Sequence, residues 1–204
     1  MHDYREDLRL FRRRRFALLF TARAVSVLGS AFAPVALAFG VLALPGADAT
    51  TLSLVLAAQA VPQVAFMLFG GVLADRLRRD RVMMVGESLS ATSYVLLGVM
   101  LVTGWAPLPG MVAAAALSGL GVAVLFPAFA GVVPEVVPAE RLQTANGLLR
   151  FGVNAARIAG YALAGAAVTL VGAGPALLVS AGLFAVSGGL VAALRLPGAL
   201  RRRS

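Results

Sequence analysis

The chain contains no cysteine and no lysine, and its one histidine is His2 in the polar N-terminal stretch. Disulfides, zinc sites built from cysteine and histidine, thiolate nucleophiles and a buried histidine base are therefore excluded. Charge is also scarce, because only 13% of the residues are charged, whereas about 25% is typical of soluble domains. This composition predicts neither an enzyme nor a protein that holds a metal or another cofactor.

What the chain has in excess is apolar sequence, at 60% of its residues and a mean hydropathy of +0.89. Six apolar stretches each reach the roughly 20 residues that a helix needs to cross the hydrocarbon of a bilayer. Barrel strands would instead alternate polar and apolar residues, a pattern that the sequence lacks. The sequence thus predicts an all-α polytopic membrane protein with a six-helix bundle at 16–196 between basic tails at 1–15 and 197–204. We place the spans at about 16–44, 51–74, 82–105, 111–133, 142–171 and 175–196.

The positions of the arginines predict the topology. Of the 18 arginines, 15 lie in the two tails, in the link at 75–81, at Arg141 and at Arg195, all on one side of the predicted bundle. The intervening links at 45–50, 106–110 and 172–174 contain none. Cytoplasmic links carry the excess of basic residues, so both termini are expected in the cytoplasm. The clusters are short, border the spans and lack interleaved aromatics for base stacking, which favours contact with membrane lipid over nucleic acid.

Charged residues inside the spans are candidate functional groups. In the fifth span, polar side chains recur every three or four residues, so Arg150, Asn154 and Arg157 share one helix face. Arg157 lies too deep to reach water and should face a cavity, an acidic partner or an anionic part of a substrate. Arg150 and Arg23 are shallow enough either to extend to the surface or to line a substrate path. Glu87, the one acid within a span, either forms an ion pair or carries a proton.

Two further features concern helix packing. Ala156, Gly160 and Ala164 are spaced four residues apart, which predicts a face on which a neighbouring helix can approach closely. Proline occurs inside three spans, where a kink either lines a cavity or only adjusts packing. These prolines are Pro34, Pro62 and Pro127.

The link between the second and third spans combines Gly71, Asp75, Arg76 and Arg79. A carboxylate is disfavoured at a helix C-terminus, where the helix dipole is negative, so Asp75 needs an arginine or the N-terminus of another helix beside it. Such a contact would latch the cytoplasmic side of the bundle. The alternative is a loop that only sets topology, with Asp75 neutralised by a neighbouring arginine.

The segment Gly71-x-Leu73-Ala74-Asp75-Arg76-x-x-Arg79 resembles the cytoplasmic loop motif between helices two and three of the major facilitator superfamily. Two positions depart from that motif: Arg78 stands where glycine is common, and Asp80 stands where a second base is common. Segments elsewhere in the first five spans are similar to the enterobactin-exporter-like and macrolide-efflux-like branch. They include Val25–Ser30, Pro127–Phe129, Val133–Pro138, Ala145–Gly147 and Ala156–Gly160.

This resemblance implies a secondary transporter that works by alternating access between two six-helix halves, each built from 3+3 inverted repeats. The chain corresponds to the N-terminal half, so we expect a truncated or split protein, or one that pairs with a second half or a second copy. The resemblance also implies a bacterial inner membrane, export of a small molecule such as a siderophore or drug, and antiport. The superfamily's fourth-helix arginine, which is linked to proton coupling, has no counterpart between 111 and 133. The alternative is a non-transporting six-helix protein that binds a partner.

Overall fold

A computed structural model describes residues 9–194 except Leu77, and it describes no side chains for residue 9 or for 68–77. A 3₁₀ turn, η1 (Arg9–Arg12), precedes six long helices, and a second, η2 (Ala139–Arg141), precedes the fifth of them. Each of the six is long and apolar enough to cross a membrane, and no strand occurs within the described ranges. The helices are α2 (Arg14–Leu42), α3 (Ala49–Arg76), α4 (Arg79–Thr103), α5 (Leu108–Val136), α6 (Leu142–Val171) and α7 (Ala173–Leu194).

The predicted fold class, an all-α polytopic membrane protein with six spans, is confirmed. The helix ends differ from the predicted span ends by at most three residues, as at the start of α4, which begins at residue 79 instead of 82. One difference has a clear cause. The fourth span was expected to end at 133, yet α5 continues through both Pro127 and Pro134 to Val136. Neighbouring helices in a membrane bundle tolerate prolines that would end a helix in water.

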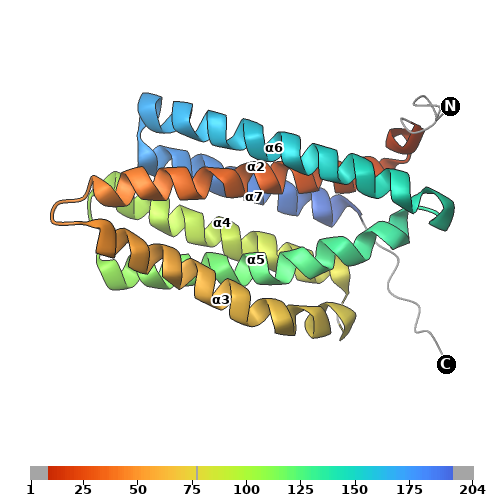
Figure 1. Ribbon diagram of the computed structural model, residues 1–204, viewed down its shortest axis with the longest axis horizontal. Coiled ribbons are helices and arrows are strands. Elements are labelled where there is room, and N and C mark those ends of the chain that lie inside the picture. Colours follow the sequence, from red (N-terminus) through yellow and green to blue (C-terminus); the bar gives the residue numbers. More distant parts are fainter. Residues whose placement is uncertain (1–8, 77, 195–204) are drawn as a thin grey trace.

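The helices pair in a symmetric pattern. In Figure 1, α3 and α6 lie on opposite sides of the bundle, with α2, α4, α5 and α7 between them. The extensive contacts join α3 to α5, α6 to α2, α4 to α7, α2 to α7, and α4 to α5. Exchanging α2, α3 and α4 for α5, α6 and α7 leaves this set of pairs unchanged. This is the pattern that 3+3 inverted repeats produce.

Two serines join the repeats in equivalent ways. Ser93 of α4 donates a hydrogen bond of 2.6 Å to the carbonyl oxygen of Ala114 in α5. Ser180 of α7 donates one of 2.8 Å to the carbonyl oxygen of Gly29 in α2. The exchange that relates the two repeats turns the first helix pair into the second. Because lipid is as apolar as the side chains, hydrogen bonds and close packing supply much of the force that holds such helices together.

Helix α6 packs on α2 through small residues. A Cβ atom at Gly160 would lie 2.7 Å from Cβ of Ala31 and 3.0 Å from the carbonyl oxygen of Leu28, so only glycine allows this approach. All the buried residues of α6 belong to this face: Ala145, Gly152, Ala156, Gly160 and Ala164. The opposite, polar face of α6 is therefore left without a helix packed on it, and it borders the candidate site.

The links between the helices form two groups, one without arginine and one with it. Figure 1 shows the arginine-free links after α2, α4 and α6 at one end of the bundle, and η1, the start of α4, and η2 at the other. The arginines at 12–15, 78, 79, 81 and 141 therefore gather at a single end of the molecule.

Candidate functional site

Two adjoining cavities penetrate the bundle. The first, of about 440 Å³, lies between α2, α5 and α6, and the second, of about 430 Å³, extends among all six helices. Arg23, Phe126 and Arg157 line both, so the cavities meet at two guanidinium groups and a phenyl ring. The first is also lined by Leu19, Phe129, Ala130, Val133, Asn146, Leu149, Arg150, Val153 and Asn154. The second is also lined by Ser26, Val27, Ser30, Pro34, Gln59, Gln63, Tyr94, Val122, Leu125, Tyr161 and Phe184.

Helix α6 supplies the polar wall of the first cavity. Arg150, Asn154 and Arg157 lie on one face because they follow one another at intervals of four and three residues. All three side chains are exposed, and the cavity is the space that they border. The small residues on the other face hold α6 against α2, which turns this polar stripe toward α5. Together with Arg23 of α2, four of the residues singled out in the sequence thus line one cavity.

Arg23 supplies the facing charge from α2. Its guanidinium carbon lies 4.6 Å from the centroid of the Phe129 ring of α5. A cation over an aromatic face is stabilised by about 0.5–2 kcal/mol, depending on how far it is desolvated. The side chain is half-buried and borders both cavities.

The second cavity contains polar groups that were not singled out in the sequence. Gln59 of α3 donates a hydrogen bond of 3.1 Å from Nε2 to Oη of Tyr94 in α4, and the Tyr94 ring stacks on Phe184 of α7 with centroids 5.4 Å apart. Gln63, one turn beyond Gln59, lines the same space. Two glutamines four residues apart in an otherwise apolar span were the available signal, because a buried amide needs a polar partner.

Glu87 lies outside both groups of lining residues. Its side chain is 1% exposed, and Oγ of Ser187 in α7 lies 2.8 Å from its Oε1. Arg23 is near enough to act on it electrostatically. Of the two expectations for Glu87, the ion pair is not formed within the described part of the chain, where a serine hydroxyl is its hydrogen-bonding neighbour.

The loop motif is described only in part. Gly71, Asp75 and Arg76 lie in the stretch whose side chains are outside the described part of the chain, so the expected latch at Asp75 has no structural account. Arg79 is described: its Nη1 donates hydrogen bonds to the carbonyl oxygen of Gly131 and, at 3.1 Å, to Oε1 of Glu135. Arg79 thereby joins the start of α4 to the end of α5.

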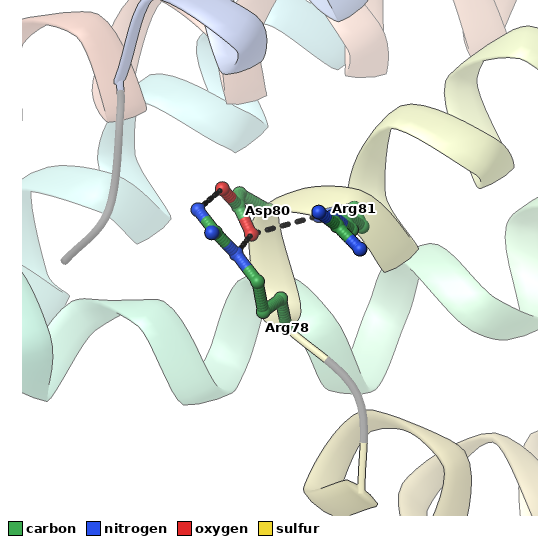
Figure 2. Close-up of polar contacts among 3 residues, drawn as sticks. All are labelled: Arg78, Asp80 and Arg81. Carbon is green, nitrogen blue, oxygen red and sulfur yellow. Dashed lines mark hydrogen bonds and ion pairs between the residues drawn. The ribbon is translucent and has the colours of Figure 1, made fainter. Parts of the chain in front are cut away.

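The two departures from the family motif contact each other. Figure 2 shows Arg78 and Asp80 paired, with Nη2 of Arg78 2.8 Å from Oδ2 and Nε 3.2 Å from Oδ1. The backbone N–H of Arg81 donates a further bond of 3.0 Å to Oδ1. The hydrogen bond with Asp80 raises the pKa of Arg78 above its usual value. Asp80 also lies in the first turn of α4, where the helix dipole favours a negative charge.

No cluster of three or more histidine, cysteine, aspartate or glutamate residues with the geometry of a metal site occurs in the described ranges. The polar groups gathered here are instead guanidinium, amide and hydroxyl groups beside aromatic rings. This combination can bind an anionic or polar group and an attached apolar body.

Comparison with known proteins gives two results. The sequence profile of the transmembrane secretion effector family, within the major facilitator superfamily, matches residues 7–196. Over 115 residues the chain is 35% identical to a lysophospholipid transporter, LplT, of Photorhabdus laumondii subsp. laumondii. The aligned part is 52% of this chain and 27% of that transporter, so the chain spans well under two thirds of its relative's length. The similarity to the enterobactin and macrolide branch is not reproduced by these comparisons.

Proposed function

We propose that this chain, which belongs to the transmembrane secretion effector family of the major facilitator superfamily, is one six-helix half of a secondary transporter. In this role it moves a small amphiphilic molecule with an anionic group by alternating access. The membrane is a bacterial inner membrane, and transport is export coupled by antiport. The observation that supports the substrate class most strongly is the meeting of Arg23 and Arg157 at the junction of the two cavities.

The charge balance of the site supports an anionic group. Arg23, Arg150 and Arg157 all border the first cavity, and the residues lining it include no carboxylate. A guanidinium within a membrane span is costly unless it is hydrated or meets an anion. An anion that binds between Arg23 and Arg157 would satisfy both charges at once. Phosphate and carboxylate match the fork of donors on a guanidinium, and both are therefore candidate groups.

The rest of the lining supports an attached apolar body. Three residues of α5 form an apolar wall of the first cavity opposite the polar stripe: Phe126, Phe129 and Val133. A lysophospholipid combines a phosphate with a single acyl chain, and the relative named above transports molecules of that class. We therefore favour an anionic lysolipid over the siderophore or drug expected from the sequence.

The shape of the bundle supports pairing with a second six-helix half or a second copy. Helices α3 and α6 are each packed extensively on one neighbour only. Helix α3 exposes apolar side chains such as Val61 (65% exposed) and Val64 (68% exposed). A substrate held between two halves would be enclosed, whereas these cavities are bordered by the exposed polar face of α6. A non-transporting protein that binds a partner through the same surface is the competing function.

Binding by the purified chain tests the substrate class. We expect lysophosphatidylglycerol, which is anionic, to bind more tightly than lysophosphatidylcholine, a zwitterion with the same acyl chain. Arg157→Leu should weaken binding of the anionic lipid by roughly ten- to hundredfold, since a hydrogen bond to a charged group contributes about 1.5–3 kcal/mol. Arg157→Lys keeps part of the affinity if only charge matters, and little of it if the guanidinium fork is needed.

The matched control is Arg81→Leu, which removes an exposed arginine outside both cavities and should leave binding unchanged. Equal affinity for the two lipids, or equal binding by Arg157→Leu and the parent chain, would refute an anion site at Arg157. Specific binding without flux in proteoliposomes, with a second six-helix partner present, would favour the non-transporting alternative.

The orientation is testable because the chain has no native cysteine. Single cysteines at Asp48, Ala106 and Gly172 should react with an impermeant thiol reagent added to intact cells, and a cysteine at Arg78 should not. Both termini would then be cytoplasmic, as the positions of the arginines predict. Labelling at Arg78 from outside would reverse the orientation.

A further inference from the structure

The carboxyl group of Glu87 is enclosed where α2, α4 and α7 meet. One hydroxyl oxygen, Oγ of Ser187, lies 2.8 Å from Oε1 of Glu87 and 2.9 Å from the carbonyl oxygen of Ala22 in α2. The other carboxyl oxygen, Oε2, is buried and has no hydrogen-bond partner among the described residues. Three oxygens from three helices thus form a short chain in the order Glu87, Ser187, Ala22.

The number of protons shared by these three oxygens depends on the protonation state of Glu87. A serine hydroxyl has one proton, and a backbone carbonyl can only accept. If Glu87 were a carboxylate, the single proton of Ser187 could serve only one of the two contacts, and the other would bring two lone pairs together. If Glu87 is a carboxylic acid, it donates to Ser187 and Ser187 donates to Ala22. Both contacts then contain a proton.

The surroundings also favour the neutral form. A charged carboxylate in an apolar interior is costly unless it is paired and fully hydrogen-bonded. Arg23 of α2 is the nearby cation, but it forms no ion pair with Glu87, and its guanidinium lies over the Phe129 ring.

No other charge on the neighbouring helices offsets a negative Glu87. The described part of α7 carries no charged residue, and the other cations of α2 and α4 lie in the first turns of those helices, at the end of the bundle: Arg14, Arg15, Arg79 and Arg81. The charge of Arg157 in α6 acts electrostatically on Arg23. The carboxyl group therefore has no ion-pair partner among the described residues.

We propose that Glu87 is a proton-binding site that is occupied in this conformation, and that its proton holds α4 to α7 and α2 through Ser187. Loss of the proton converts Glu87 from a donor to an acceptor, so Ser187 must turn its own proton away from Ala22. Deprotonation then removes the contact between α7 and α2 at this point and leaves an uncompensated charge among three helices. The site concerns proton binding by the chain itself and does not depend on the proposed transport function.

Infrared spectroscopy of the purified chain tests this site directly, because a carboxylic acid and a carboxylate absorb at different frequencies. At neutral pH we expect an acid carbonyl band that disappears in Glu87→Gln. The matched control is Glu135→Gln, which replaces an ion-paired glutamate at the end of the bundle and should leave the band unchanged. In Ser187→Ala the band should remain but move to the higher frequency of an acid that has lost its acceptor. If Glu87→Gln gives no folded protein, the shift in Ser187→Ala identifies the band.

Absence of an acid band at neutral pH, or a band that neither Glu87→Gln nor Ser187→Ala alters, would overturn the proposal. Thermal unfolding provides a second measurement. A proton held by the native state and released by the unfolded chain makes stability fall as pH rises. The parent chain should therefore lose stability toward alkaline pH relative to Glu87→Gln, whose amide cannot ionise. Parallel pH profiles for the two proteins would contradict an occupied proton site.

Discussion

Arg157 and Glu87 both lie within the membrane-spanning part of the chain, yet their side chains lie in opposite environments. Arg157 is exposed on the face of α6 that borders two cavities, whereas Glu87 is 1% exposed and enclosed by three helices. The difference follows from how the two helices are packed. Helix α6 contacts α2 extensively and other helices little, while α4 is covered by α5 on one side and α7 on the other. A charge persists where a helix face is left open, and it must be neutralised where both faces are covered.

The largest expected effect comes from placing a charge in the enclosed position. Glu87→Arg should prevent recovery of folded protein, because an uncompensated buried charge costs about 3–5 kcal/mol and the larger side chain has no room. Arg157→Glu reverses a charge at the open position and should still yield folded protein. The yield of monodisperse protein after size-exclusion chromatography measures both. Equal yields would show that the Glu87 region is as open as the cavity.

A smaller effect on stability is expected at the contact between Arg23, which borders both cavities, and the ring of Phe129. Phe129→Leu removes the aromatic face under Arg23 while retaining most of the apolar volume. A double-mutant cycle with Arg23→Gln should give a coupling energy of about 0.5–2 kcal/mol in thermal unfolding. A coupling near zero would mean that the contact with the ring does not stabilise Arg23 in its position between the cavities.

Tyr94→Phe tests the amide and hydroxyl pair in the second cavity. The substitution leaves Nε2 of Gln59 without its acceptor but retains the ring that stacks on Phe184. Hydrogen bonds between membrane helices average about 0.6 kcal/mol, so a small decrease in melting temperature is expected. A decrease as large as that of a core truncation would indicate that Tyr94 organises more of the cavity than this one bond.

The smallest effect is expected at the end of the bundle. Replacing Arg78 with glutamine or Asp80 with asparagine removes an ion pair that is exposed on its arginine side, and such pairs contribute little to stability. We expect melting temperatures close to that of the parent for both variants, with the larger decrease for the loss of Arg78, because the carboxylate left behind is the buried partner. A larger decrease for Asp80→Asn would reverse this assignment.

The sequence was sufficient to predict the six helices, because the length of an apolar span depends only on local composition. It also placed Arg150, Asn154 and Arg157 on one face, since helical periodicity determines which side chains lie together. The direction in which that face points was not predictable from periodicity. It depends on which neighbour accepts the small residues of α6, and the close approach of Gly160 to Leu28 is a contact between distant segments.

The environment of Glu87 could not be predicted from the sequence, because it too depends on contacts between distant segments. Ser187 is 100 residues away along the chain, and nothing in its own span distinguishes it from Ser180, the other serine of α7. Gln59 likewise gains its partner only when α3 and α4 come together at one cavity. Pairwise contacts between spans require the packing of the whole bundle, whereas span boundaries do not.

The pair formed by Arg78 and Asp80 limits the order in which these two positions can change during evolution. Asp80 is buried and depends on its neighbour, whereas Arg78 is exposed to water on one side. A lineage that first replaced Arg78 with the glycine common in the superfamily would pass through a chain with a poorly compensated carboxylate. Replacing Asp80 first would leave an arginine whose side chain is 44% exposed, so its charge stays in contact with water. The accessible route between this loop and the common motif therefore begins at Asp80, and the fitness effect of glycine at position 78 depends on whether that first step has occurred.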